Sequence, residues 1–168
     1  MHCFLTERFE TPVGPMVLVA RNGVVLQFEF EGTPGRIERQ MRQRFGDVAL
    51  EPATNPFGIG DRIRAYFDGD ITSLDDLLTD GGGTAFERQV WSELRMIPAG
   101  STVSYGEIAR KLGDVQLSRA VGTANGKNPI AIIVPCHRVI GAGGLMTGYG
   151  GGLKNKEWLL RHEGVLLI

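Results

Sequence analysis

The chain has 168 residues, which is enough for one medium-sized domain or two small ones. Its hydrophobic fraction of 42% and charged fraction of 22% are typical of a globular protein, and no apolar run approaches the ~18 residues that span a membrane. The N-terminus shows no secretory signal, and the two cysteines, Cys3 and Cys136, exclude a disulfide framework, so a cytoplasmic protein is expected.

The net charge of −1 conceals an asymmetry between the two halves of the chain. Residues 1–83 contain 8 basic and 13 acidic residues, a net charge of −5, whereas residues 84–168 contain 10 and 6, a net charge of +4. A cationic half beside an anionic half indicates that the C-terminal half faces a polyanion. The alternative is an ordinary solvated surface, and charge alone does not decide between the two.

A β-hairpin is predicted near the N-terminus. Segments 16–20 and 24–30 are apolar and β-branched, and Asn22-Gly23 between them is a strong hairpin signal. In the second segment, large apolar residues alternate with polar ones from Leu26 onward. This alternation predicts one buried face and one solvated face.

Helices are expected to cover this hairpin. Apolar residues recur at helical spacing over residues 35–45 and again over residues 56–67. Residues 1–79 are therefore predicted to form an α/β domain, a small antiparallel sheet with helices. No catalytic constellation is found in this domain.

Residues 80–83 are rich in glycine and are predicted to be a linker to a second, mostly helical domain over residues 84–168. Thr84 and Glu87 have the S/T-x-x-E form of a capping box, which opens a helix. Apolar residues at helical spacing continue from there to Ile97.

A helix-turn-helix is predicted next along the chain. A second capping box, Ser104 to Glu107, opens a short helix, and residues 117–126 are predicted to form another helix after a turn that contains Gly113. Many helical hairpins bind nothing, so the motif alone is a weak signal. The basic character of this half of the chain favours DNA binding.

The second helix of this pair is rich in small residues, with Ala120, Val121 and Ala124 expected to pack inward. A thin helix can lie close to a nucleic-acid backbone or enter a narrow groove. Arg119, near its start, is either a surface charge or an arginine that fills the gap left in the base stack by an extruded nucleotide. The residues predicted to contact DNA are Arg119, Ser104, Ser118, Ala120, Gly122, Thr123 and Lys127.

The most informative stretch is Pro135-Cys136-His137-Arg138-Val139. The aliphatic residues 130–134 before it are predicted to form a buried strand, and Pro135 ends regular pairing just before the cysteine. A thiol in this partly desolvated, electropositive setting is favoured as the thiolate. A lone cysteine is most often a small buried hydrophobe. Polar neighbours and the glycine-rich segment 141–152 favour a reactive one instead.

An activated thiol needs a base, and the base needs an orienting group. His137 can be the base for Cys136, with a water between them because adjacent side chains seldom bond directly. A closing helix is predicted over residues 155–162 with Gly164 as its cap, and Glu163 is either a surface carboxylate or the group that orients His137. No P-loop ending and no zinc-ligand spacing is present, so neither a metal nor a cofactor is expected.

The residues 135–139, with Asn128-Pro129 ahead of them and Gly148 to Gly152 behind, resemble the active-site signature of the alkylguanine-DNA alkyltransferases, also called methylated-DNA–protein-cysteine methyltransferases. The likeness covers residues 84–164 with almost no gaps, and its motifs are highly specific. It implies a DNA repair protein that flips O6-alkylguanine out of duplex DNA. The alkyl group is then transferred irreversibly to Cys136, once per molecule and without a cofactor, and O4-alkylthymine is also accepted.

The resemblance also implies roles for individual residues. Tyr105 helps to rotate the nucleotide and protonates the purine ring, Glu163 holds His137, and Asn128 supports the active-site turn. The base pocket is expected to contain Val139, Tyr149, Gly150 and Lys156, with the carbonyls of Cys136 and Val139 as acceptors for the exocyclic amine of guanine. Some members of the family have serine at Gly150 and proline at Ala131, which implies a lost side-chain hydrogen bond and a roomier pocket here.

The expected partner is double-stranded DNA containing O6-alkylguanine, bound by a monomer of which several copies can cluster on the DNA; no membrane partner is expected. Two other functions stay open. A Cys-His-Glu hydrolase would use the same triad but turn over many times. A DNA-binding module without chemistry would resemble alkyltransferase-like proteins that lack the cysteine, and the presence of Cys136 argues against it.

Overall fold

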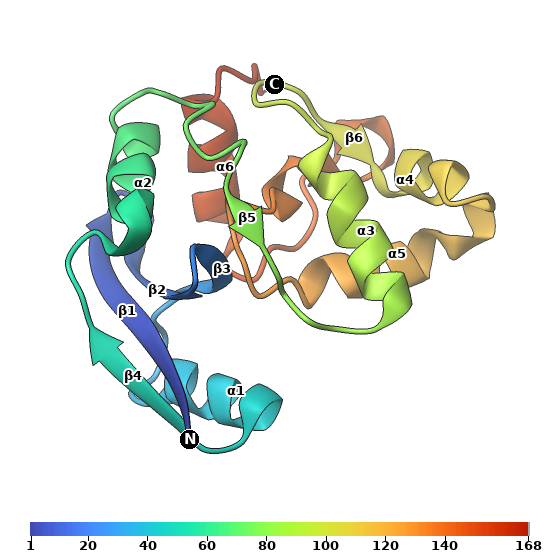
Figure 1. Ribbon diagram of the computed structural model, residues 1–168. Helices are drawn as coiled ribbons and strands as arrows, with labels where there is room; N and C mark the ends of the chain where they lie inside the picture. Colours follow the sequence, from blue (N-terminus) through green and yellow to red (C-terminus); the bar gives the residue numbers. More distant parts are fainter. Residues whose placement is uncertain (168) are drawn as a thin grey trace. The chain divides into compact units, whose positions relative to one another are not determined.

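The protein is described here by a computed structural model that covers residues 1–167 (Figure 1). The chain divides into two compact units, one comprising Met1–Gly82 and the other beginning at Gly83. Among residues 1–167, no helix is long and apolar enough to cross a membrane.

The first unit is built on a five-stranded mixed sheet with the order β4-β1-β2-β3-β5. Pairs β1–β2 and β2–β3 are antiparallel, whereas β4 pairs with β1 and β5 pairs with β3 in parallel. The prediction of an antiparallel sheet is therefore wrong at both edges, because parallel neighbours come from crossover connections that local patterns do not show. The strands are β1 (His2–Thr11), β2 (Gly14–Arg21), β3 (Val24–Phe30), β4 (Val48–Pro52) and β5 (Leu78–Thr79).

The predicted hairpin is confirmed, since β2 and β3 flank Asn22 and Gly23, whose φ values of 55° and 78° suit a tight two-residue turn. The predicted solvated face of β3 is wrong at Gln27, which is only 3% exposed. Its side-chain amide donates to the Gln40 side chain. Strand β1 was not predicted. Its buried residues Phe4 and Phe9 are five positions apart and so face opposite sides of the sheet, which hides the alternation of polar and apolar residues that marks a strand.

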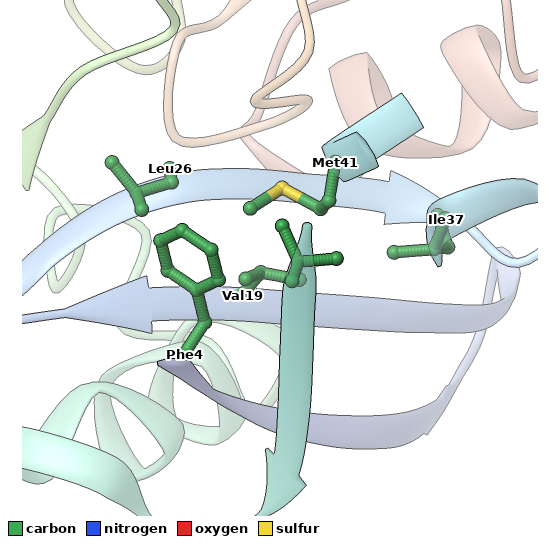
Figure 2. Close-up of a cluster of buried hydrophobic side chains, with 6 residues drawn as sticks. Phe4, Val19, Leu26, Ile37 and Met41 are labelled. Carbon is green, nitrogen blue, oxygen red and sulfur yellow. The ribbon is translucent and has the colours of Figure 1, made fainter. Parts of the chain in front are cut away.

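Helix α1 (Arg36–Phe45) confirms the predicted amphipathic helix and covers the sheet with Ile37 and Met41. Figure 2 shows the side chains of Ile37 and Met41 in one cluster with those of the strands. Burial of this apolar surface is the main force that holds the helix on the sheet. The cluster consists of Phe4, Val19, Leu26, Ile37, Met41 and Val48.

The second predicted helix begins three residues later than expected. Residues Pro56–Gly58 form a short 3₁₀ turn (η1) in which Phe57 and Gly58 have positive φ values of 56° and 75°, so the regular helix α2 runs over Ile59–Phe67. Its buried residues include Ile59, Ile63 and Tyr66.

The second unit is mostly helical, as predicted. Both predicted capping boxes are present: Thr84 with Glu87, and Ser104 with Glu107. One short parallel pair of strands, β6 with β7, is added to the helices. The elements are α3 (Ala85–Arg95), β6 (Val103–Ser104), α4 (Tyr105–Lys111), α5 (Ser118–Gly126), β7 (Val139–Ile140) and α6 (Leu153–His162).

Helices α4 and α5 pack on each other and are joined by a turn that ends in the 3₁₀ segment η2 (Val115–Leu117). Val121 and Ala124 of α5 are buried as expected, but the prediction is wrong for Ala120, which is exposed although it lies one turn before Ala124. The indole N–H of Trp91 donates to the Ala124 carbonyl at 2.9 Å and so ties α3 to α5. One face of α5 is thereby left open.

Helix α6 begins two residues before the predicted start. It ends at His162, and Gly164, whose φ of 91° is one that glycine adopts without strain, closes its C-terminal end. The Gly164 N–H donates to the Arg161 carbonyl and the Val165 N–H to the Leu160 carbonyl, which is a common way to close a helix. This closure places Glu163 at the end of the helix.

Candidate active site

The aliphatic segment before the cysteine is buried as predicted, but it is not a strand. All of residues 130–134 are at most 5% exposed, yet they form no strand, and Ile130 alone makes an isolated β-bridge. The chain turns instead, with the Ile133 N–H on the Ala131 carbonyl at 2.7 Å and the Val134 N–H on the Ile130 carbonyl at 3.0 Å. The φ of Ile132 is 69°, a strained value for a β-branched residue.

Asn128 supplies hydrogen bonds that a neighbouring strand would otherwise provide. Its side chain is buried, and its amide nitrogen donates to the carbonyls of Val134 at 2.8 Å and Ile130 at 3.3 Å. Its amide oxygen accepts the Ile130 N–H at 3.0 Å. A buried turn needs such partners for its backbone groups, so Asn128 fixes the path of the chain into the cysteine.

Cys136 begins a short 3₁₀ turn, η3 (Cys136–Arg138), directly after Pro135. Its N–H donates to the Val134 carbonyl at 2.8 Å, and the residue is 7% exposed. Its carbonyl accepts from the Asn125 side chain of α5 at 3.4 Å. The thiol is therefore held on a rigid turn rather than on a flexible loop.

His137 and Glu163 lie together, as the sequence analysis predicts. His137 Nε2 is 2.9 Å from Glu163 Oε2, and both side chains are fully buried. Burial raises the pKa of Glu163, but hydrogen bonds from His137 and Arg138 outweigh it and bring the pKa to about 2. Burial lowers the pKa of His137, and the bond to Glu163 offsets only part of this effect. The pair therefore consists of a neutral imidazole and a carboxylate at neutral pH.

Arg138 was not among the predicted site residues, yet it shares the Glu163 carboxylate. Its Nε donates to Oε1 at 2.8 Å and its Nη2 to Oε2 at 2.9 Å. Adjacency to His137 gives no sign in the sequence that both side chains turn toward one carboxylate. The charges of Arg138 and Glu163 cancel in the interior.

Lys156 of α6 is completely buried, and its ammonium donates to the carbonyls of Val139 at 2.6 Å and Thr147 at 3.2 Å. Burial lowers its pKa, and the charge of Cys136 acts in the opposite direction. A negative charge on Cys136 would therefore be offset by the buried ammonium of Lys156.

Tyr105 is the first residue of α4, and its hydroxyl is 2.9 Å from the hydroxyl of Thr147 in the glycine-rich segment. Thr147 thus contacts both Tyr105 and Lys156, a role that nothing in the sequence pattern marks. Tyr149 is half-buried and Gly150 exposed in the same segment. The predicted pocket residues therefore come from η3, β7, α6 and this segment, all within the second unit.

The predicted DNA-contacting residues lie on α5 or beside it, apart from Ser104 at the start of α4. The exposed ones are Arg119, Ala120, Thr123 and Lys127. The other three are half-buried: Ser104 caps α4 by accepting the Glu107 N–H, Ser118 donates to the Val115 carbonyl, and Gly122 lies against the Tyr105 ring. Among residues 1–167, no group of three or more His, Cys, Asp or Glu side chains is placed to hold a metal ion.

Known sequences and structures are similar to this chain over almost its whole length. The family of the 6-O-methylguanine DNA methyltransferase, DNA binding domain, matches residues 85–165. The methylated-DNA–protein-cysteine methyltransferase of Shigella flexneri is 47% identical over 167 residues, which covers 98% of each chain. Fold and buried cysteine together define the class of DNA methyltransferases whose acceptor is a cysteine of the protein itself.

Two crystal structures extend the likeness to the whole fold. That of Mycobacterium tuberculosis O6-methylguanine methyltransferase superposes with a TM-score of 0.80 at 41% identity, covering 97% of this chain and 93% of that one. That of Mycobacterium tuberculosis OGT in complex with DNA gives a TM-score of 0.81 at 42% identity, covering 95% and 92%. The chain therefore belongs to the methylated-DNA–protein-cysteine methyltransferase family.

Proposed function

We propose that this protein takes O6-alkylguanine out of duplex DNA and transfers the alkyl group to its own Cys136, once per molecule. The observation that carries the proposal is the buried cluster in which Cys136 faces Lys156 and is followed by the His137–Glu163 pair. A buried thiolate beside a cation is a soft nucleophile suited to an alkyl carbon. The thioether product resists water and thiols, so the acceptor is used up.

The proposed transfer is a single displacement. The thiol proton passes through a water to Nδ1 of His137, and the Cys136 sulfur attacks the alkyl carbon. The new S–C bond forms as the C–O6 bond breaks, and its electron pair stays on guanine. Tyr105 gives a proton to the purine ring and its phenolate is reprotonated from solvent, while the His137 imidazolium releases the thiol proton to solvent. The sum is one thiol and one alkylguanine giving one thioether and one guanine.

We assign recognition of the base to backbone groups near the cysteine. The carbonyls of Cys136 and Val139 would accept from the exocyclic amine of guanine. The Val139 carbonyl accepts from Lys156 and has a second lone pair for the base, whereas the Cys136 carbonyl already accepts from the Val139 N–H and, at 3.4 Å, from the Asn125 side chain, which the base would have to displace or share. Thymine lacks this amine, so O4-alkylthymine is expected to be a poorer substrate. Tyr149 would wall the pocket, with the Gly150 N–H as a donor.

Helices α4 and α5 would act as a helix-turn-helix on the DNA. The open face of α5 has short side chains that allow close approach to a groove, and Arg119 is exposed there. We assign Arg119 the place in the base stack that the flipped nucleotide leaves. O6 lies inside the base pair, so the reaction requires this extrusion.

The test is the mass of the intact protein after incubation with excess duplex DNA that contains one O6-methylguanine. A gain of one methylene mass, confined to a peptide with Cys136 and stopping at one equivalent, is the expected result. A Cys136→Ala variant should bind the same DNA without gaining mass. Repeated loss of the lesion without a mass gain would instead identify the hydrolase. An unchanged lesion and an unchanged mass would leave only DNA binding.

A further inference from the structure

Arg138 makes an unusually complete set of contacts for a buried arginine. It is 5% exposed, its Nε and Nη2 grip both oxygens of Glu163, and its Nη1 donates to the Ile97 carbonyl at 2.7 Å. A planar guanidinium that holds a carboxylate at two points fixes both the position and the rotation of that carboxylate. The orientation of Glu163 is therefore set by Arg138 as well as by α6.

The shared oxygen connects this grip to the histidine. Oε2 of Glu163 accepts from Arg138 Nη2 and lies 2.9 Å from His137 Nε2. Because hydrogen bonds keep the pKa of Glu163 at about 2, the carboxylate is an acceptor, and the imidazole proton belongs on Nε2. The other nitrogen, Nδ1, is buried and has no hydrogen-bond partner among the described residues. Its lone pair is the one that can accept the proton of the thiol.

Four charged or titratable groups act on His137. Glu163 at the end of α6 favours the imidazolium, whereas Arg138 on η3 and Lys156 on α6 oppose it. Cys136 adjoins it in the chain, and the end of α3 contributes the Ile97 carbonyl through Arg138. Without Arg138, Glu163 would be a buried carboxylate hydrogen-bonded to His137 with no arginine to balance its charge, and such a carboxylate draws a proton onto the imidazole.

We propose that Arg138 is a positioning residue for alkyl transfer: its guanidinium orients Glu163 toward His137 and its charge keeps His137 in the neutral form that can accept the thiol proton. The proposal rests on the proposed role of His137 as the base. The rival explanation is purely structural, in which Arg138 merely ties η3 to α3 and α6. The two differ in what they predict for the protonation of His137.

The decisive measurement is the pH dependence of transfer under single-turnover conditions, compared in wild type, Arg138→Lys and Arg138→Met. In Arg138→Met, the midpoint of the acid limb should move to higher pH by about one unit or more, because a like charge next to His137 is removed. Arg138→Lys keeps the charge but loses the two-point grip, so its midpoint should stay near that of wild type while its plateau rate falls. A lower plateau in Arg138→Met without any shift of the midpoint would overturn the proposal.

A second readout does not depend on transfer. An NMR titration of the His137 ring in the protein without DNA should show the same upward shift of its pKa in Arg138→Met. If wild type transferred nothing while this titration still shifted, the proposed function would fail and the electrostatic role of Arg138 would stand. An unshifted titration would refute that role whatever the transfer rate.

Further variants serve as controls for the effect of Arg138 on the pKa of His137. Arg161→Met removes an arginine whose guanidinium pairs with Glu157 on the exposed side of α6, and it should leave His137 unchanged. If Arg138→Met does not fold, the pair Glu163→Gln and Arg138→Met/Glu163→Gln isolates the same charge without a lone buried carboxylate. The pKa of His137 should then be higher in the double variant than in Glu163→Gln. Equal values would contradict the proposal.

Discussion

His137 Nε2 lies 2.9 Å from Glu163 Oε2, although 25 residues separate the two in the chain and neither side chain is exposed. Glu163 directly follows α6, where the helix dipole is unfavourable for a negative charge. Hydrogen bonds from His137 and Arg138 compensate for that placement. The carboxylate is thus held in an unfavourable position by the two groups to which we assign roles in alkyl transfer.

Acid should destabilise the fold through these two residues. Burial lowers the pKa of His137 from 6.5; burial raises that of Glu163, but its hydrogen bonds bring it from 4.5 to about 2. In both cases the folded state binds fewer protons than the unfolded chain, so the free energy of unfolding falls as the pH falls. The loss should begin below pH 6.5 for His137 and continue between pH 4.5 and 2 for Glu163. Urea unfolding at a series of pH values measures it.

The matched variant is Glu163→Gln. It should flatten the pH dependence between 4.5 and 2, since the titrating carboxyl is gone. At pH 7 it should cost about 3 kcal/mol or more, because Arg138 is left as an unpaired buried charge. A variant with the wild-type slope in that interval would show that other carboxyl groups cause the acid unfolding.

Lys156→Met tests the counter-charge of the thiolate. Removing the buried ammonium should lower the fraction of Cys136 present as thiolate, so its alkylation by iodoacetamide at pH 7 should slow about tenfold or more. Lys154→Met is the control, because Lys154 is exposed on the same helix and should leave the rate unchanged. Equal rates in Lys156→Met and wild type, at matched unfolding midpoints, would remove Lys156 from the activation of Cys136.

Asn128→Ala should destabilise the protein by about 3 kcal/mol, since it leaves the buried Ile130 N–H and Val134 carbonyl without a side-chain partner at about 1–3 kcal/mol each. Asn125→Ala is the matched comparison. The Asn125 side chain is also buried, but it makes one long hydrogen bond, and its Oδ1 has no partner among the described residues. The Asn125 change should therefore cost less. Similar losses in denaturant unfolding would mean that Asn128 acts only by filling space.

Local patterns were enough to predict the hairpin and the helices of this fold, but not strand β1 or the contacts between elements. The capping boxes at Thr84 and Ser104 and the hairpin at Asn22 depend only on residues close together in the sequence, and all three are present. The prediction of a strand over residues 130–134 is wrong because an aliphatic run indicates burial but not whether the segment pairs with a strand. The side chain of Asn128 supplies backbone hydrogen bonds to this segment in place of a neighbouring strand.

The candidate site shows the same division. Cys136 and His137 belong to one short motif. Glu163 could be singled out because a carboxylate at the end of a helix is unfavourable unless it has a partner. Arg138 and Thr147 were missed because their roles depend on the direction of side chains across elements far apart in sequence. Adjacency in the chain says nothing about whether Arg138 turns toward His137 or away from it.

Arg119→Ala should separate nucleotide flipping from chemistry. Transfer from O6-methylguanine in duplex DNA should slow by at least tenfold, because the gap in the stack is no longer filled and extrusion costs a few kcal/mol. Reaction with the free base O6-methylguanine should be unchanged. Arg110→Ala on α4 removes another exposed arginine and should affect duplex transfer much less. Equal losses with duplex and free base would reject the stacking role of Arg119.

Thr147→Val tests whether the hydroxyl of Thr147 positions that of Tyr105. The two oxygens are 2.9 Å apart, and valine keeps the shape of threonine while removing the hydrogen bond. Transfer should slow several-fold, since the Tyr105 proton would no longer be aimed at the purine ring, while the affinity for duplex DNA stays the same.

A double-mutant cycle makes the Thr147 test specific. Tyr105→Phe removes the proton donor itself and should slow transfer much more than Thr147→Val. If Thr147 acts through Tyr105, then adding Thr147→Val to Tyr105→Phe should cause no further loss. A full additional loss in the double variant would mean that Thr147 acts elsewhere, for example through its carbonyl contact with Lys156 at 3.2 Å, which shapes the same segment from the other side.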